Sequence, residues 1–241
     1  MNTATYTRRR AEIEQYFDRT AADTWARLTS DAPVSRVRET VREGRDRMRA
    51  TLLGWLPADL SGRRILDAGC GTGALAVEAA RRGAEVLAID LSPQLVDVAR
   101  LRAAELRAQA PWPGHIEFTH GDMSAESLGH FDHVVAMDSL IHYRTPDALK
   151  LLATLAPRVQ GEGASMLFTF APASPLLMAM FSVGKLFPRG DRSPAIVPVA
   201  ESALRTGLAQ EPALHTWSLA QTLRIKSGFY TSQAYELRRG R

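Results

Sequence analysis

The stretch Ile65-Leu66-Asp67-Ala68-Gly69-Cys70-Gly71-Thr72-Gly73 decides the fold of this chain. Residues 63–68 predict a short apolar strand, and the residues from 74 onward predict a helix. The glycines between them permit a tight turn and a close approach of the backbone to a ligand. A strand, a glycine-rich turn and a helix N-terminus together predict a site for a nucleotide-like ligand at the carboxyl edge of a parallel sheet.

The glycine spacing is compatible with two kinds of ligand. Gly69 and Gly71 begin a G-x-G-x-x-G dinucleotide fingerprint whose third position falls on Ala74. That fingerprint accepts alanine, so the spacing alone leaves NAD open. The fuller string D-x-G-C-G-T-G, however, resembles motif I of the class I S-adenosylmethionine (SAM) methyltransferases. This resemblance favours SAM over NAD, although motif I is specific only for the superfamily.

Strand and helix patterns alternate after the N-terminal region. Strands are predicted at 63–68, 85–89, 115–119, 131–137 and 164–171, with helices at 74–82, 93–109 and 145–157. This alternation predicts an α/β fold, a Rossmann-like doubly wound sheet of five parallel strands. A helix at about 199–209 and an antiparallel strand pair within 214–237 resemble the usual tail of the class I methyltransferase fold.

Four regions are expected. Residues 1–57 predict cap helices at about 9–28 and 34–55, with residues 1–8 frayed. Residues 58–171 form the SAM-binding core, and residues 199–241 complete it. Between them, residues 172–198 contain five prolines and an apolar run, 176–187, that is too apolar to lie exposed without a partner. This segment predicts a mobile arm or lid, and a helix buried against the domain is the alternative.

Composition excludes several kinds of function. The net charge is +4, but basic and acidic residues are interleaved, as in Arg45-Asp46-Arg47, which is typical of a solvated helix face and predicts no nucleic-acid partner. Cys70 is the only cysteine, so neither an intrachain disulfide nor a cysteine metal cluster is expected. No Asp/Glu/His set has the spacing of a protein metal site. The chain shows neither a secretory signal nor a run long enough to span a bilayer, which predicts a cytoplasmic protein or one attached to a membrane surface.

Acidic residues follow the predicted second and third strands. Asp90, about 20 residues after the glycine turn, is placed to accept two hydrogen bonds from ribose hydroxyls. The resemblance to methyltransferases implies that Asp122 accepts from the adenine amine and that Met123 lies under the ring. An ordinary Gly-Asp turn is the alternative at Asp122.

One family shares several further strings with this chain. They are Tyr16-Phe17-x-x-x-Ala21, Trp25-x-Arg27, Leu140-Ile141-His142-Tyr143, and Phe170-Ala171-Pro172 with Leu186-Phe187-Pro188. These strings resemble the magnesium-protoporphyrin IX O-methyltransferases of chlorophyll and bacteriochlorophyll biosynthesis, over most of the chain from Tyr16 to the last strand. The resemblance implies methyl transfer from SAM to one propionate, which gives a monomethyl ester. Magnesium would then belong to the tetrapyrrole substrate and not to the protein.

The resemblance also implies roles for particular residues. His142 would be catalytic, either by hydrogen-bonding the propionate or by removing a proton from its protonated fraction; a structural hydrogen bond is the alternative. Family members carry a tyrosine two residues after Trp-x-Arg, where this chain has Thr29, so that role is not carried over. The predicted cofactor-binding residues are Tyr16, Asp67, Gly69, Cys70, Gly71, Asp90, Leu91, Asp122, Met123 and Asp138.

Two other classes of function remain open. A quinone-type O-methyltransferase would share the fold, motif I and a histidine after the fourth strand. A SAM-binding protein without activity is disfavoured, because Asp67, Asp90 and Asp122 are all present. The family resemblance further suggests contact with the magnesium chelatase that supplies the substrate. The apolar run 176–187, with Lys185 and Arg189 near anionic head groups, suggests peripheral association with the photosynthetic membrane.

Overall fold

A computed structural model of the chain describes residues 4–19, 36–173 and 196–240. Its strands are β1 (Arg64–Ala68), β2 (Glu85–Asp90), β3 (His115–His120), β4 (His133–Ala136), β5 (Ser165–Phe170), β6 (Trp217–Ser227) and β7 (Tyr230–Arg239). Its α-helices are α1 (Ala4–Arg19), α3 (Arg36–Trp55), α4 (Ala74–Arg81), α5 (Pro93–Gln109), α6 (Thr145–Leu155) and α8 (Glu201–Gln210).

The strands form one sheet in the order β3-β2-β1-β4-β5-β7-β6. The first five are parallel, and β7 runs antiparallel to both β5 and β6. This arrangement confirms the predicted doubly wound sheet with a C-terminal antiparallel pair. The fourth strand is shorter than the predicted 131–137, because Phe131 makes only an isolated bridge with Val159 before β4 begins.

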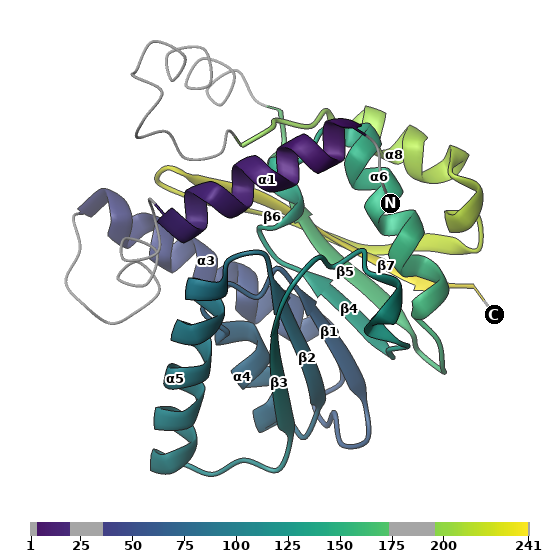
Figure 1. Ribbon diagram of the computed structural model, residues 1–241. Helices are drawn as coiled ribbons and strands as arrows, with labels where there is room; N and C mark the ends of the chain where they lie inside the picture. Colours follow the sequence, from purple (N-terminus) through teal and green to yellow (C-terminus); the bar gives the residue numbers. More distant parts are fainter. Residues whose placement is uncertain (1–3, 20–35, 174–195, 241) are drawn as a thin grey trace.

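Helices cover both faces of the sheet (Figure 1). Successive strand residues point to opposite faces, so neighbouring residues of β1 enter different cores. Ile65 belongs to the cluster that holds Leu52 of α3 and Ala79 of α4, whereas Leu66 belongs to the cluster that holds Leu151 of α6. Helix α1 crosses above the carboxyl ends of the strands (Figure 1). The carboxyl edge, where a parallel sheet binds its ligands, therefore has a helical cover.

The N-terminal helix begins earlier than predicted. It starts at Ala4, so the expectation that residues 1–8 are frayed is wrong for residues 4–8. Tyr6 is the cause: its side chain is 2% exposed, and its hydroxyl donates a 2.6 Å hydrogen bond to Asp122. The predicted continuation of this helix towards Leu28, Thr29, and residues 174–195 of the predicted arm lie outside the described residues.

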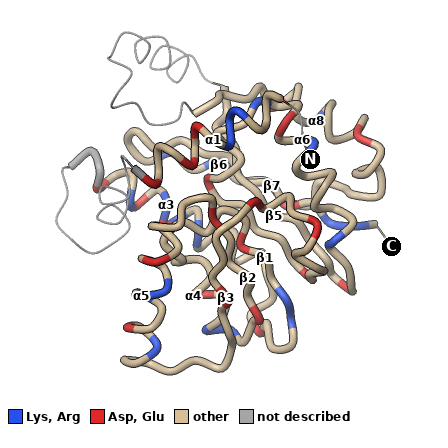
Figure 2. Tube along the Cα trace, viewed as in Figure 1, with Lys and Arg blue, Asp and Glu red and all other residues tan. Residues whose placement is uncertain are grey.

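Charges of both signs share the helix surfaces. On α5, for example, Asp97 pairs with Arg100 at 2.9 Å, and both signs follow one another along this helix (Figure 2). In the parts of the chain that the structure describes, no helix combines the length and the apolarity needed to cross a bilayer.

Candidate active site

The glycine turn after β1 is fixed by the end of β2. The backbone N–H groups of Gly69 and Cys70 both donate to the carbonyl of Ile89, at 2.8 and 3.0 Å. Gly69 has a φ of +89°, and a Cβ at this position would overlap the Cβ of Ser139. A side chain is therefore excluded at Gly69 by both backbone conformation and space.

A cavity of about 210 Å³ lies at the carboxyl ends of β1, β2 and β4. Most of the predicted site residues line it. They are His142, Asp67, Gly69, Cys70, Gly71, Asp90, Leu91, Met123 and Asp138. Tyr16 and Asp122 are not among the described residues that line it. The structure therefore gathers the residues of four separate chain segments around one space.

Asp67 is the most buried acid of the cavity. It is 2% exposed, and its Oδ2 has no hydrogen-bond partner among the described residues. Burial, and next the charge of Asp90, raise the pKa of Asp67 to about 7. A buried carboxylate without a partner is costly, so this position favours a ligand that brings a positive charge or a donor.

Asp90 is held by the backbone around it. Its Oδ2 accepts from the N–H of Gly71 at 2.8 Å, and its Oδ1 accepts from the N–H of Ser92 at 3.0 Å. Burial nevertheless raises the pKa of Asp90. Each carboxylate oxygen has two lone pairs, so Asp90 can still accept from ligand hydroxyls while it fixes the turn.

Cys70 has the properties of a packing residue. Burial, and then the charges of Asp90 and Asp67, raise the pKa of its thiol well above the ordinary value. A neutral thiol is a poor nucleophile. Cys70 therefore contributes shape, and its backbone N–H, to the turn.

Asp138 has an unusual backbone conformation at the end of β4. Its φ is +52°, the one positive value among the described residues other than glycine. Its carboxylate accepts from Arg45 at 2.8 Å and from the Tyr230 hydroxyl at 3.1 Å. The next residue, Ser139, donates to the carbonyl of Ala68 at 2.7 Å. Such conformations persist only where surrounding contacts over-determine them, as they do here.

His142 lies in the short 3-10 helix Leu140–His142 and lines the cavity at 7% exposure. Its ring meets Phe17 of α1 edge-on, with centroids 5.8 Å apart. Its carbonyl accepts a 2.7 Å hydrogen bond from Nε of Arg9, also on α1. The cap helix therefore helps to hold the predicted catalytic residue in place.

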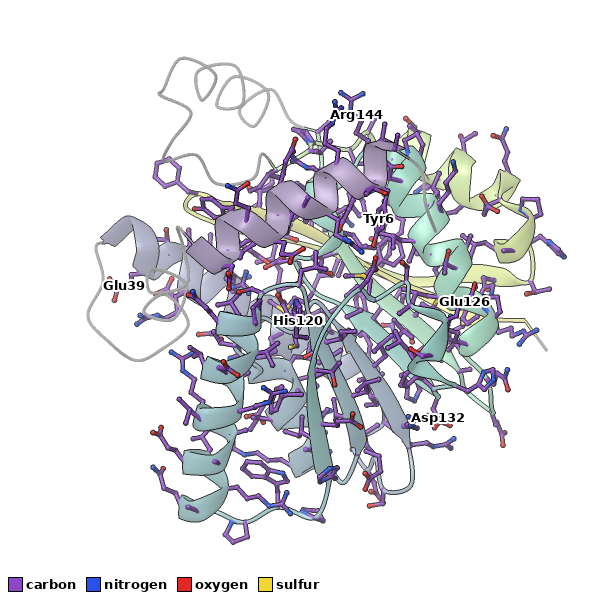
Figure 3. All side chains as sticks on the ribbon, viewed as in Figure 1. Tyr6, Glu39, His120, Glu126, Asp132 and Arg144 are labelled. Carbon is purple, nitrogen blue, oxygen red and sulfur yellow. The ribbon has the colours of Figure 1, made fainter. Side chains whose placement is uncertain are left out.

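Asp122 and Tyr16 lie differently from the other predicted residues. Asp122 accepts from Tyr6 at 2.6 Å, from the N–H of Ser124 at 2.8 Å and from Arg10 at 3.0 Å. Burial alone would raise the pKa of Asp122, but these hydrogen bonds lower it below its ordinary value. The side chain of Tyr6 points from α1 towards the strand ends (Figure 3). Tyr16 packs edge-on against Phe17, at 5.2 Å between centroids.

The contribution of α3 to the cavity was not predicted from the sequence. Arg42, Arg45 and Arg49 all line it. The interleaved charges suggest a solvated face, which is correct for the exposed Arg47 and wrong for Arg45, whose side chain is 19% exposed. The signal was the spacing of three and four residues between these arginines, which places them on one face of a helix.

The site fits SAM. Asp90 offers a carboxylate to hydroxyl groups, the glycine turn admits a close ligand, and the buried Oδ2 of Asp67 calls for a cation or a donor. The fold and this site define a class I SAM-dependent methyltransferase. In agreement, residues 65–163 match the family model "Methyltransferase domain", and residues 136–239 match "Magnesium-protoporphyrin IX methyltransferase C-terminus".

Relatives place the chain more narrowly. It is 49% identical over 235 residues to the magnesium-protoporphyrin O-methyltransferase of Rhodobacter capsulatus, covering 97% of this chain and 98% of the relative. The crystal structure of magnesium protoporphyrin IX methyltransferase from Synechocystis PCC 6803 with bound SAH superposes with a TM-score of 0.80, at 29% identity, covering 95% and 99% of the two chains. A ubiquinone biosynthesis O-methyltransferase of Xanthomonas oryzae is 38% identical over 137 residues, 55% of each chain. The chain belongs to the magnesium-protoporphyrin O-methyltransferase family.

Proposed function

We propose that this chain transfers the methyl group of SAM to a propionate carboxylate of magnesium protoporphyrin IX and forms the monomethyl ester. The observation that carries the proposal is the 49% identity with the Rhodobacter capsulatus enzyme over nearly the full length of both chains. The quinone alternative is weaker, because the ubiquinone relative aligns with only 55% of the chain. That alignment is too short to include both the cap helices and the C-terminal hairpin.

The cofactor would lie along the ends of β1 and β2. Asp90 would accept hydrogen bonds from the ribose hydroxyls, while Gly69 leaves room for the backbone to approach the ligand. Asp67 would face the positively charged end, and Met123 would lie against the adenine ring. When bound, SAM supplies an electrophilic methyl group: the acceptor oxygen bonds to the methyl carbon as the carbon–sulfur bond breaks, and the electron pair stays on sulfur.

The acceptor side of the cavity has to orient a carboxylate and remove the water bound to it. A propionate with a pKa near 4 is ionised at neutral pH, so the nucleophile needs no strong base. The protein therefore contributes orientation and exclusion of water. Ile13 and Phe17 of α1 line the cavity and supply an apolar wall. Such a wall favours methyl transfer, because the reaction neutralises a negative oxygen and a positive sulfur.

His142 would act at the acceptor. From its place in the cavity wall it would donate a hydrogen bond to the propionate or take the proton from the small protonated fraction. Its contact with Phe17 and the Arg9 hydrogen bond to its carbonyl fix the ring with respect to α1. His142 would thus align the nucleophile.

The proposal also includes the source of the magnesium and a peripheral contact with a membrane. The described residues include no group of three or more His, Cys, Asp or Glu side chains that could hold a metal ion; magnesium would arrive with the tetrapyrrole. Peripheral membrane association stays a prediction, because the apolar run 176–187 lies outside the described residues. Contact with a magnesium chelatase is a prediction of the resemblance alone. Sedimentation of the purified protein with anionic vesicles, with and without magnesium protoporphyrin, tests the membrane contact.

Labelled SAM tests the activity. The purified protein is incubated with methyl-labelled SAM and with magnesium protoporphyrin IX, its dimethyl ester or a demethyl-quinone, and the products are separated by chromatography. We expect label only in the monomethyl ester of magnesium protoporphyrin. The dimethyl ester is the matched control, since it has no free carboxylate. Label in the quinone would support the alternative, and SAH binding without any transfer would support a non-catalytic protein.

A further inference from the structure

Asp138 is the strained residue of the cavity wall. Its φ of +52° lies in the left-handed region, which residues other than glycine occupy at a cost, although aspartate does so more readily than most. Asp138 and its two chain neighbours, Met137 and Ser139, all line the cavity and form a corner at the end of β4 (the β4 corner, residues 137–139). Strain of this kind in the wall of a binding site indicates that the site needs this backbone conformation.

The β4 corner lies against the glycine turn. The Ser139 hydroxyl donates to the carbonyl of Ala68 at 2.7 Å, and a Cβ at Gly69 would overlap the Cβ of Ser139. The 3-10 helix Leu140–His142 follows directly and carries His142 to the cavity. A different conformation at Asp138 would therefore displace both the neighbour of the glycine turn and the start of the helix that holds His142.

Residues of two further strands hold Asp138 in this conformation. The sheet runs β4-β5-β7, with Thr169 in β5 and Tyr230 as the first residue of β7 (Figure 1). The backbone N–H of Asp138 donates to Oγ1 of Thr169 at 2.8 Å. The Tyr230 hydroxyl lies 3.1 and 3.2 Å from the two carboxylate oxygens of Asp138, whereas Arg45 and Ser232 each donate to one of them, at 2.8 and 3.4 Å. Tyr230 therefore links the C-terminal hairpin to the cavity wall.

Tyr230 is a fixed donor. It is 9% exposed, and burial, and next the charge of Asp138, raise the pKa of its hydroxyl, which stays protonated and donates. Its ring packs against α3 at Gly44, where a Cβ would lie 2.5 Å from the ring. A packed tyrosine has only two side-chain torsions to fix, so it restrains Asp138 more closely than a long arginine side chain does.

We propose that Tyr230 is a positioning residue of the cofactor site: it holds Asp138 in the left-handed conformation, and the β4 corner held in this way forms the wall against which SAM binds beside the glycine turn. Tyr230 does not itself line the cavity and acts through Asp138. The inference concerns SAM binding, so it does not depend on which acceptor is methylated.

Cofactor affinity of Tyr230→Phe tests this role. The variant keeps the packed ring and removes the hydroxyl. We expect SAH affinity, measured by calorimetry well below the thermal midpoint of every variant, to fall roughly 5- to 10-fold, the range for one lost buried hydrogen bond.

Tyr235→Phe is the matched control for lost stability. Tyr235 lies on the same strand, is fully buried and donates at 2.8 Å to Glu201 of α8. Neither Tyr235 nor Glu201 lines the cavity. This variant also loses a hydroxyl that binds a carboxylate, so its thermal midpoint should fall while its SAH affinity stays that of the wild type.

Two substitutions of Asp138 separate its backbone from its carboxylate. Asp138→Gly and Asp138→Ala both remove the carboxylate that Arg45 and Tyr230 bind, but only glycine adopts the left-handed conformation without strain. We expect Asp138→Gly to bind SAH roughly tenfold more tightly than Asp138→Ala. Adding Tyr230→Phe to Asp138→Gly should cause no further loss, because the hydroxyl then has no carboxylate to hold.

The outcomes separate this inference from the proposed function. A wild-type SAH affinity in Tyr230→Phe overturns the inference, and so does an equal loss in Tyr235→Phe, which would reduce the effect to lost stability. Equal SAH affinities of Asp138→Gly and Asp138→Ala also overturn it and assign the carboxylate itself to the cofactor. None of these measurements needs an acceptor, so a failure to methylate magnesium protoporphyrin refutes the proposed function alone. A wild type that does not bind SAH overturns both.

Discussion

The two halves of the cavity are built by different kinds of contact. In the half that would bind the cofactor (the cofactor half), the backbone N–H groups of Gly69, Cys70 and Gly71 tie the turn after β1 to the end of β2, all within one strand–helix–strand unit. In the half that would bind the acceptor (the acceptor half), side chains far apart in the sequence meet. Arg45 reaches Asp138 across 93 residues, and Arg9 reaches the His142 carbonyl across 133. A short motif can therefore encode the first half but not the second.

The same difference separates cofactor binding, which is general to the fold, from substrate choice, which is particular to the family. Any SAM enzyme of this fold needs the glycine turn and an acid such as Asp90. The acceptor half depends on α1, α3 and the β6–β7 hairpin, which lie outside the strand–helix core. Substrate choice should therefore be altered by changes in the caps and the hairpin that leave cofactor binding intact. The variants below test this separation, from the largest expected effect to the smallest.

Gly69→Val should destabilise the glycine turn of the cofactor half and give the largest effect. The positive φ strains a β-branched residue, and its Cβ would overlap Ser139, so we expect the free energy of unfolding to fall by roughly 4 kcal/mol. Urea unfolding measures this. Gly54→Ala is the control, since a Cβ there meets nothing within 4 Å, and alanine should raise helix stability by up to about 1 kcal/mol. Equal effects would refute the steric argument.

His142→Ala should affect the acceptor half alone. Loss of the group that aligns the propionate should lower the single-turnover methylation rate roughly 100-fold, while SAH affinity measured by calorimetry stays the same. His130→Ala, at an exposed position before β4 begins, serves as the control. A wild-type rate would return His142 to a structural role. Loss of SAH binding together with the rate would indicate a collapsed cavity.

Asp90→Ala should affect the cofactor half alone. Without the carboxylate, the ribose hydroxyls lose a charged acceptor, and SAM affinity should fall by about 2 kcal/mol, roughly 30-fold. Calorimetry gives the value directly. Asp97→Ala removes an exposed carboxylate of α5 as a control and should change little. An unchanged affinity in Asp90→Ala would mean that the ribose lies elsewhere.

The pH dependence of cofactor affinity tests Asp67. Because its pKa is raised to about 7, the charged fraction of Asp67 falls as the pH falls from 8 to 6. A neutral Asp67 attracts a cation less, so SAM affinity should weaken by about tenfold over that range. Asp67→Asn removes the titrating group and should flatten the profile. A profile that keeps its slope in this variant would assign the dependence to another group.

Sequence patterns predicted the cofactor half because its determinants are local. The run of glycines, Asp67 before them and Asp90 at the end of the next strand have fixed spacings. The parallel sheet follows from the alternation of strands and helices. Arg45 could not be recognised in this way. Its place in the cavity wall depends on its contact with Asp138, 93 residues later, and on a helix surface an arginine beside Asp46 looks like any solvated residue.

Asp122 is a second residue whose contacts could not be predicted from local sequence patterns. The resemblance predicts a contact with adenine, and Met123 beside it does line the cavity. The carboxylate itself, however, is held by Tyr6 and Arg10 of α1. The sequence around Tyr6 does not predict this contact, because no residue near Tyr6 in the sequence indicates that its hydroxyl binds a distant carboxylate. Its partner comes 116 residues later.

Tyr6→Phe should give the smallest effect, confined to the cover over the acceptor half. Burial raises the pKa of Tyr6, so its hydroxyl is a donor, and its ring stacks on Tyr143 at 5.3 Å. Phenylalanine keeps the stacking and removes the hydroxyl, with its hydrogen bond to Asp122, which still accepts from Ser124 and Arg10. Local opening of α1 should therefore become easier by about 1 kcal/mol, seen as roughly fivefold faster amide exchange over residues 4–19.

A second tyrosine of the same helix provides the comparison. Tyr16 packs on Phe17 and does not contact Asp122 in the structure, so Tyr16→Phe should leave exchange in α1 unchanged. If Asp122 also contacts adenine, SAH would slow exchange in α1 of the wild type, because the ligand fixes the carboxylate that α1 binds. This protection should shrink in Tyr6→Phe and persist in Tyr16→Phe. Equal exchange in all three proteins would show that Asp122 does not hold α1, and the acceptor half would then depend on Arg9 and Phe17 for its cover.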